Sequence, residues 1–296
     1  RTCGSDMWTG IELLASSAEV QLLSKSKIED AIVAIDAPHN GKVVIDDATL
    51  NANYIGLKIT GTGVANSSYI GSSAIFSCKN SSNVNANCLK SPHSSQRTLQ
   101  GICLNGIGSI SIGDASNSSN EISNCETGIY TSTSTVNVTK TDFEVCNIGI
   151  NAQNDAALNV TSSNFDECVT GIDDRYNVDL NVSSCNFNTG TKGIYTSLGN
   201  TISIGIHDNN FTDFTAFAIQ HISNHRVQYS IYNNIISNTG SEGMNYPGGI
   251  EINGLYDNSI DNNSVTDIYL NEFYNLAKGI HLQSIDYAHI FNNLHN

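Results

Sequence analysis

The strongest pattern along the chain is a small residue followed by an aliphatic one, which returns at nearly regular steps from end to end. Between Ile129 and Ile194 the steps are 21, 22 and 22 residues, and later steps are longer. The gap from Leu57 to Ile102 is about twice as long, which fits either two turns or one turn with a long insertion. The repeated pairs are Gly10-Ile11, Ala34-Ile35, Gly56-Leu57, Gly101-Ile102, Gly128-Ile129, Gly149-Ile150, Gly171-Ile172, Gly193-Ile194, Ala218-Ile219, Gly249-Ile250 and Gly279-Ile280.

Short alternating segments recur in phase with these pairs. Val136-Asn137-Val138, Leu158-Asn159-Val160 and Leu180-Asn181-Val182 alternate apolar and polar residues with period 2, which is typical of a β-strand with one buried face. Clusters of Asn, Asp, Gly and Ser after them indicate turns. Each repeat therefore holds two or three short strands and no helix. A unit this small cannot bury its own apolar residues, so it must stack on its neighbours.

The repeats predict an all-β fold, a right-handed parallel β-helix (solenoid) of about eleven turns. Stacked strands lie about 4.8 Å apart, so the rod would be roughly 50 Å long. Ile129, Ile150, Ile172 and Ile194 should stack inward on consecutive turns. We expect one domain over residues 1–296, with an insertion at about 60–100.

Composition narrows the function. The chain of 296 residues contains 13 Lys and Arg and 28 Asp and Glu, so its formal charge is −15. Binding to nucleic acid needs clustered cations, so this balance argues against a nucleic-acid partner. We expect no membrane insertion, because no apolar run is long enough to span a bilayer. An acidic chain rich in Asn and Ser is typical of a secreted or surface-exposed protein. The chain starts without a signal peptide and stops inside a repeat, so we expect a piece of a larger polypeptide.

These repeats resemble the right-handed parallel β-helix repeat family. Asn209-Asn210-Phe211 followed by Ala218-Ile219 is one instance of the family's pattern. The opening Cys3-Gly4-Ser5-Asp6-Met7-Trp8-Thr9-Gly10-Ile11 resembles the start of β-helical modules in large secreted or surface proteins of Bacteroidota-type bacteria. The resemblance implies a fold and leaves the function open, since the family includes adhesins, secreted cargo and enzymes that act on polysaccharides.

If the aliphatic residue of each pair points inward, the next residue points outward, once per turn. From the middle of the chain onward this outward column is polar and contains two tyrosines. Aromatic rings pack on sugar rings while acids and amides bond sugar hydroxyls, so the column is a candidate surface for binding glycans. Its alternative is an ordinary solvated face. The candidate ligand-binding residues are Tyr130, Asp173, Tyr195, Gln220, Glu251 and His281.

Catalysis would need a second group near an acid. Glu251 and His281 form the best acid and base pair in the column, but the catalytic residues stay unknown. Asp173 and Glu251 are three turns apart, about 14 Å, which exceeds the separation of paired carboxylates in glycosidases. β-Helical polygalacturonases carry four motifs, of which only Asp173-Asp174 has a counterpart here. We expect Asp173-Asp174-Arg175 to form a solvated turn.

The cysteines predict two arrangements. Cys125, Cys146 and Cys168 each lie four residues before the aliphatic of their repeat, so they should stack as a buried ladder that is mainly reduced. Cys78 and Cys88 flank a polar stretch inside the expected insertion, and a disulfide between them would close it.

Two functions remain open. The first is a non-catalytic β-helical module of a secreted or cell-surface protein, an adhesin or stalk that binds glycans or another surface protein. The second is a polysaccharide lyase or glycoside hydrolase that uses the polar column from Asp173 to His281. We expect no metal site and no cofactor; calcium would suit the many Asn and Asp oxygens, but the chain has no calcium-binding motif.

Overall fold

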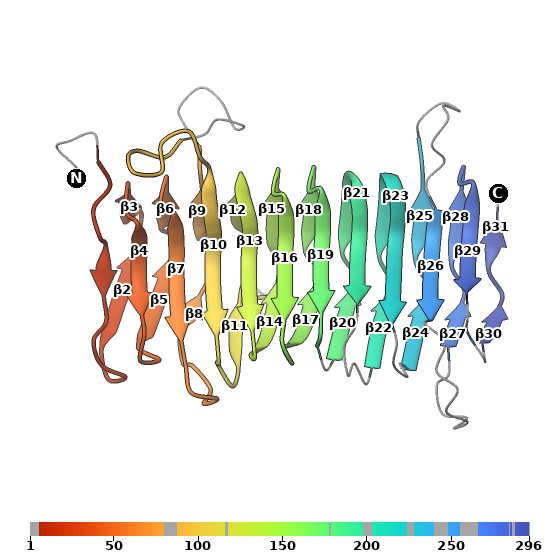
Figure 1. The fold of residues 1–296 in the computed structure, drawn as a ribbon, viewed down its shortest axis with the longest axis horizontal. Coiled ribbons are helices and arrows are strands. Elements are labelled where there is room, and N and C mark those ends of the chain that lie inside the picture. The colour runs from red at the N-terminus through yellow and green to blue at the C-terminus, as the bar shows by residue number, and fades with distance from the viewer. Residues whose placement is uncertain are drawn as a thin grey trace.

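The computed structural model describes residues 6–79, 88–115, 118–177, 179–197, 203–223, 228–239, 248–254, 266–283, 285 and 288–295. Within them every regular element is a β-strand, and all named strand pairs are parallel. The strands stack into a rod with the two ends of the chain at opposite ends (Figure 1). The predicted all-β parallel solenoid is confirmed. No helix among the described residues has the length and apolarity needed to cross a membrane.

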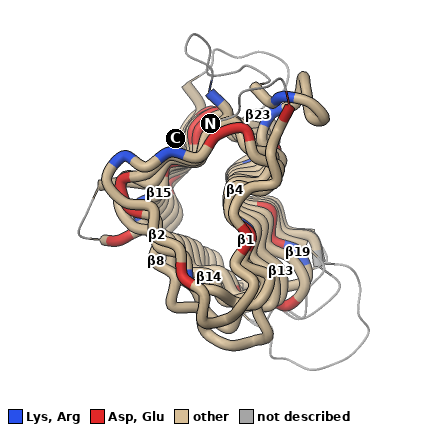
Figure 2. The backbone as a smooth tube through the Cα atoms, turned by 90° about the vertical axis from the view of Figure 1, so that its left-hand side faces the viewer, with Lys and Arg blue, Asp and Glu red and all other residues tan. Residues whose placement is uncertain are grey.

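Each coil of the rod has three sides, here called faces A, B and C in chain order. Viewed along the rod, the coils lie over one another (Figure 2). Face A consists of β1 (Ile11–Glu12), β4 (Val33–Ala37), β7 (Ile55–Thr60), β10 (Thr98–Asn105), β13 (Cys125–Ser132), β16 (Ile148–Gln153), β19 (Thr170–Arg175), the C-terminal parts of β21 (Asn186–Ser197) and β23 (Asn210–Ser223), β26 (Gly248–Gly254) and β29 (Lys278–Gln283).

Faces B and C complete the coils. Face B is the 11-stranded sheet, with one strand from each coil. It contains β2 (Glu19–Leu23), β5 (Lys42–Asp46), β8 (Tyr69–Ile70), β11 (Ile110–Ile112), β14 (Thr135–Thr139), β17 (Ala157–Thr161), β20 (Asp179–Ser183), β22 (Ser203–His207), β24 (Gln228–Tyr232), β27 (Thr266–Tyr269) and β30 (Ala288–Phe291). Face C contains β3 (Lys27–Glu29), β6 (Thr49–Asn51), β9 (Ile75–Ser77), β12 (Asn120–Ser123), β15 (Thr141–Glu144), β18 (Asn164–Asp166), the N-terminal parts of β21 and β23, β25 (Ile235–Ser237), β28 (Glu272–Tyr274) and β31 (Leu294–His295).

The core consists of columns of identical or similar side chains. Ile129, Ile150, Ile172 and Ile194 pair in register on consecutive coils and are fully buried, as predicted. On face C four phenylalanine rings stack with centroids 4.6, 4.6 and 4.7 Å apart and nearly parallel planes. These rings belong to Phe143, Phe165, Phe187 and Phe211.

Several of the glycines that precede an aliphatic residue lie against these rings. A Cβ atom added to Gly149 would lie 2.7 Å from Cδ1 of Phe165, and Gly171 has the same relation to Phe187. Where the small residue is Ala218 instead, the face C side chain in the same coil is Ile236 rather than phenylalanine. The glycine thus makes room for the ring of its own coil and for the carbonyl oxygen of the glycine in the next coil, which a Cβ on Gly149 would approach to 2.6 Å.

The long gap between Leu57 and Ile102 is one coil with an insertion, because these two residues pair directly. We expected the insertion at about 60–100, but β8 and β9 occupy the first part of that range as regular strands of faces B and C. The segment that leaves the coil therefore runs between β9 and β10. A disulfide joins Cys78 to Cys88 at its base, with Cα atoms 5.6 Å apart, and this is the pairing that the sequence favours.

Two further ladders run inside the rod. Cys125, Cys146 and Cys168 are buried and free, as the spacing predicts. The second ladder is made of asparagines, which the alternating pattern did not single out. Each side-chain amide oxygen accepts from the backbone N–H group at the corresponding position of the preceding coil, and its nitrogen donates to a carbonyl oxygen of that coil. Its members are Asn209, Asn234, Asn271 and Asn293.

Candidate functional site

The outward column of face A is continuous in the structure. Direct pairings run from Glu12 through every intermediate coil to His281. All six predicted ligand-binding residues lie in it, and we call the part from Tyr130 to His281 the outer strip. The outer strip consists of Tyr130, Asn151, Asp173, Tyr195, Gln220, Glu251 and His281.

Alternation along the strands places these side chains outside, because each follows an inward isoleucine. The predicted solvated turn in this region is wrong. Asp173-Asp174-Arg175 is part of strand β19 and forms no solvated turn. Asp173 and Arg175 point outward together, with Asp173 only 4% exposed, whereas Asp174 points inward and is 1% exposed.

At the centre of the outer strip, cations and a ring gather around Asp173. The guanidinium of Arg175 donates two hydrogen bonds to the Asp173 carboxylate, 2.6 and 2.7 Å long. The Arg175 group also lies over the ring of Tyr195, 5.3 Å from its centroid. The Lys192 ammonium lies 4.1 Å from the same centroid, and burial lowers the pKa of Lys192. Tyr195 thus contacts two cations, and Asp173 is fully paired.

Glu251 forms the second centre. One of its carboxylate oxygens lies 3.1 Å from Nδ1 of His281, and the other accepts from the side-chain amide of Gln220. The Glu251 side chain is 14% exposed and the His281 side chain 36%. The structure therefore brings together the two residues considered for catalysis. It holds them beside an amide, and no second carboxylate of the outer strip is adjacent to them.

Beneath the outer strip, the same strands carry an inward polar tract of Asp174, Thr196 and His221 on successive coils. Each is at most 4% exposed. Asp174 accepts from the amide of Asn177, and burial raises the pKa of Asp174 to about 7. Thr196 bonds Nδ1 of His221, whose Nε2 lacks a partner among the described residues. Burial lowers the pKa of His221 to about 3.

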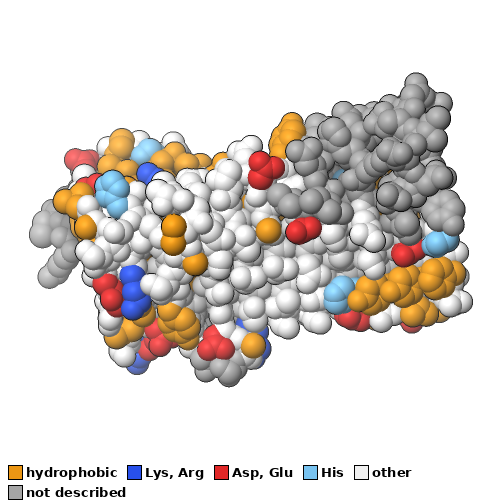
Figure 3. All heavy atoms as spheres, turned by 90° about the horizontal axis from the view of Figure 1, so that it is seen from below, with side chains coloured by type: hydrophobic (Ala, Val, Ile, Leu, Met, Phe, Trp, Pro, Cys, Tyr) orange, Lys and Arg blue, Asp and Glu red, His pale blue; other side chains and the backbone are white. Residues whose placement is uncertain are grey.

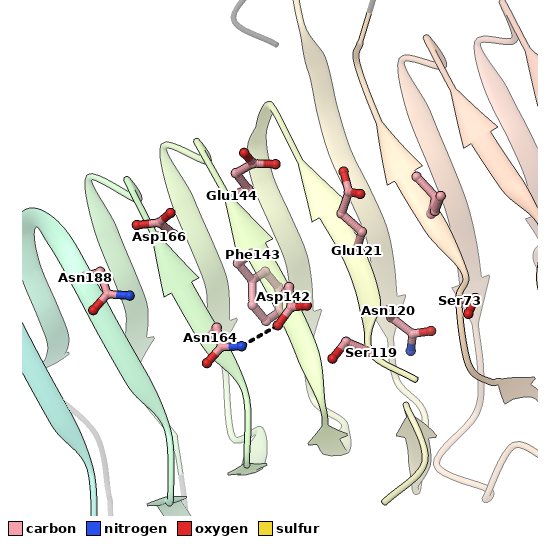
Figure 4. Close-up of a pocket in the computed structure, with 11 residues that line it drawn as sticks. Ser73, Ser119, Asn120, Glu121, Asp142, Phe143, Glu144, Asn164, Asp166 and Asn188 are labelled. Carbon is pink, nitrogen blue, oxygen red and sulfur yellow. Dashed lines mark hydrogen bonds between the residues drawn. The ribbon is translucent and has the colours of Figure 1, made fainter. Parts of the chain in front are cut away.

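A second polar surface lies on face C, which sequence reasoning missed. A groove of about 570 Å³ runs along the outside of the phenylalanine stack (Figure 4). Acids and amides line it, and Asn164 donates to Asp142 over 2.6 Å. The signal was present in the sequence, because acids and amides flank each inward phenylalanine. The acidic members of the groove are Glu121, Asp142, Glu144 and Asp166.

Lys79 is anchored at this groove. Its ammonium group binds Glu121 and also lies 3.2 Å from Glu144, so one cation bridges two coils. Burial tends to lower the pKa of Lys79, but the hydrogen bonds to the two glutamates outweigh it and leave the pKa raised. A neighbouring hollow of about 510 Å³ lies on the other side of Lys79, next to Cys88. Among the described residues, no three His, Cys, Asp or Glu side chains are arranged to hold a metal ion.

A band of aromatic side chains marks face B near the C-terminal end of the rod (Figure 3). The rings stack on one another with centroids 4.7 to 4.9 Å apart. Stacked in this way, they cover one another and leave their edges to solvent. The band stabilises the coils and offers no flat ring face to a ligand along its length. Its members are His207, Tyr232, Tyr269 and Phe291.

Fold and surface together define the class of protein as a parallel β-solenoid with a polar outer strip on one face and an acidic groove on another. No family model, curated protein or solved structure matches this chain. The chain is therefore classified by its fold alone. The opening segment that suggested a narrower resemblance lies partly outside the described residues, which begin at Asp6.

Proposed function

We propose that this chain is a non-catalytic module that binds a glycan along the outer strip. The observation that carries the proposal is the unbroken register of aromatic, amide and acidic side chains from Tyr130 to His281. A polysaccharide is also an extended repeating chain, so successive sugar units can meet successive coils. Tyrosine rings supply apolar contact, and the side-chain amide of Asn151 supplies hydrogen-bond donors.

The charges of the outer strip favour binding over cleavage. Asp173 and Glu251 are three coils apart, about 14 Å by the strand spacing. Paired carboxylates in glycosidases lie roughly 5 to 9.5 Å apart. Arg175 occupies both oxygens of Asp173, while Gln220 and His281 occupy those of Glu251. Neither acid is arranged to attack a sugar or to activate water.

We also propose that the module belongs to a larger secreted or bacterial cell-surface protein of the right-handed β-helix repeat type, as an adhesin or stalk. Its support is the even stacking along the described rod and the acidic, Asn-rich composition. A rod whose outer residues vary without changing the core suits display of a binding surface. Another surface protein is the alternative partner to a glycan.

The test is a binding assay against a panel of neutral and acidic polysaccharides. We expect binding without release of sugar ends, and at least a tenfold loss of affinity in Tyr195→Ala. Tyr232→Ala is the matched control, because Tyr232 is an outward tyrosine on face B and should bind as the wild type does. Equal binding by both variants would contradict the assignment of the outer strip.

One contact favours the second candidate, a polysaccharide lyase or glycoside hydrolase. His281 and Glu251 lie 3.1 Å apart and could share a proton between an acid and a base. In that case the same panel would release reducing ends or unsaturated uronates. Glu251→Gln and His281→Asn would each abolish that release while leaving binding in place. Turnover with these properties would replace the binding proposal by the enzyme.

A further inference from the structure

Three cysteines stack on consecutive coils at the corner between faces C and A. The residues two positions after Cys125, Cys146 and Cys168 pair directly with one another in the face A ladder. Neighbouring rungs of a parallel ladder are about 4.8 Å apart. That spacing lies within the Cα separation that a disulfide requires, roughly 4.4 to 6.8 Å. Cys125 and Cys168 are two rungs apart, about 10 Å, which is too far.

The thiol groups of this stack lie inside the rod and donate to backbone carbonyl oxygens. Cys125 donates to Ser123, Cys146 to Ile122 and Glu144, and all three cysteines are at most 2% exposed. The neighbouring thiols of Cys125 and Cys168 and the Arg97 guanidinium favour a thiolate at Cys146, so its pKa is lowered. The Cys146 thiol in turn raises the pKa of Cys125 and Cys168.

Arg97 holds its place at this corner through two contacts. Its Nε donates to Glu126 over 2.7 Å, and its Nη1 donates to the carbonyl oxygen of Val145 over 3.2 Å, one residue before Cys146. The cation comes from the end of the insertion, immediately before β10. The two other free cysteines among the described residues lie apart from the stack: Cys185 donates to the Ser183 and Val160 carbonyl oxygens, and Cys103 lies in the outward column of face A.

We propose that Cys125, Cys146 and Cys168 form an oxidation site in which Cys146 is shared. A small peroxide would convert the stack to a single disulfide, either Cys125–Cys146 or Cys146–Cys168. Either bond leaves the third cysteine as a free thiol, because an odd number of sulfurs cannot all pair. The two disulfides are mutually exclusive alternatives that would tie different pairs of neighbouring coils.

The chemistry balances with peroxide as the oxidant. The Cys146 thiolate attacks one peroxide oxygen, the O–O bond breaks, and the hydroxide that leaves takes a proton to become water. Cys146 is then a sulfenic acid. The thiol of Cys125 or Cys168 attacks its sulfur, an S–S bond forms, and the hydroxyl leaves as a second water. Two thiols are oxidised by two electrons, and one hydrogen peroxide is reduced to two waters.

The test uses the full chain, folded and treated with hydrogen peroxide, then alkylated and mapped by mass spectrometry without reduction. We expect Cys78–Cys88 in every sample and one added disulfide that includes Cys146 after treatment. The number of alkylated thiols should fall by two. Recovery of all three stack cysteines as thiols after treatment, or a Cys125–Cys168 bond, would overturn the proposal.

Single cysteine substitutions distinguish the two possible disulfides. Cys125→Ser should yield only Cys146–Cys168, and Cys168→Ser only Cys125–Cys146, so each variant predicts a positive product. Cys146→Ser should yield neither. Cys185→Ser is the control and should give the wild-type products. If Cys125→Ser and Cys168→Ser both fold by circular dichroism and form no new disulfide, the shared-cysteine site is wrong.

Discussion

At the scale of single residues, the least expected feature is the inward polar tract. In neighbouring coils the corresponding inward positions hold Ala152 and Ile252, so the core has apolar residues on both sides of the tract. Asp174 follows the inward rule of alternation, yet its charge made a solvated turn the natural prediction. The alternation along a strand predicts whether a side chain points inward or outward, and the type of side chain predicts whether it is buried or solvated. For Asp174 these two predictions disagree.

Asp174→Asn should change the pH dependence of stability. The pKa of Asp174 is raised to about 7 from an ordinary value of 3.8, so the acid is neutral in the folded rod while the unfolded chain is ionised. Its contribution to the free energy of unfolding is complete below about pH 4 and is lost as the pH rises to about 7, on the order of 4 kcal/mol in all. Relative to wild type, the Asn variant should gain stability over that range, measured by urea unfolding.

His221→Gln is the companion variant with the opposite sign. The pKa of His221 is lowered to about 3, so its contribution is present above an ordinary histidine pKa of 6.5 and is lost as the pH falls toward 3. Relative to wild type, this variant should gain stability as the pH falls. If the free energy of unfolding varies with pH in the same way for wild type and both variants, neither group is buried.

At the scale of elements, the size of the small residue on face A is related to the inward side chain on face C of the same coil. Glycine stands where phenylalanine fills the same coil, whereas an aliphatic side chain there accompanies either alanine, as with Ala218 and Ile236, or glycine, as with Gly101 and Ile122. The recurring pair of a small and an aliphatic residue was visible in the sequence and predicted the coils. The reason for glycine was not visible, because it lies in a contact between strands about 16 residues apart.

Gly149→Ala should cost about 1–3 kcal/mol of unfolding free energy, because its Cβ would press on the ring of Phe165 and on the carbonyl oxygen of Gly171. The cost should shrink by at least about 1 kcal/mol in a Phe165→Ile background, which reproduces the pairing of Ala218 with Ile236. A double-mutant cycle by denaturant unfolding measures this coupling. Additive effects of the two substitutions would refute the ring contact as the cause.

Asn234→Ala should cost about 3 kcal/mol, since it leaves the Asn209 N–H and the Ile206 carbonyl group without their partner inside the rod. The comparison is Asn159→Ala on the outside of face B, where the amide bonds only another surface amide, and a change within about 0.5 kcal/mol is expected. Thermal and urea unfolding of the two variants give the difference. A cost for Asn234→Ala as small as for Asn159→Ala would contradict a structural ladder.

At the scale of the whole molecule, each coil contacts only its neighbours, so stability is the sum of coil and interface contributions. The sequence predicted this architecture and the whole of the outer strip, because both follow from a period that is written along the chain. It did not predict the groove of face C or the anchoring of Lys79 there. Those features join side chains that are 42 and 65 residues apart and depend on the register of an interrupted coil.

Amide hydrogen exchange should therefore vary along the rod. The last described coil has a neighbour on one side, and Ile290, Phe291 and Leu294 are about half exposed. Amides of β29 and β30 should exchange on the order of 100-fold faster than those of β13 and β16, whose inward isoleucines are fully buried. Mass spectrometry of pulse-labelled peptides measures the rates. Uniform protection along the rod would indicate that it unfolds as one cooperative unit.

The constant offset between stacked partners has a genetic consequence. In the middle coils, hydrogen-bonded side chains such as Thr139 with Thr161 and Asn137 with Asn159 are 22 residues apart. A segment of 22 codons that begins at Cys146 would end just before Cys168, so its loss would place one corner cysteine where the other had been. Recombination between neighbouring repeats can then remove or add a coil in frame. Each such event would lengthen or shorten the rod by one coil, which is about 4.8 Å.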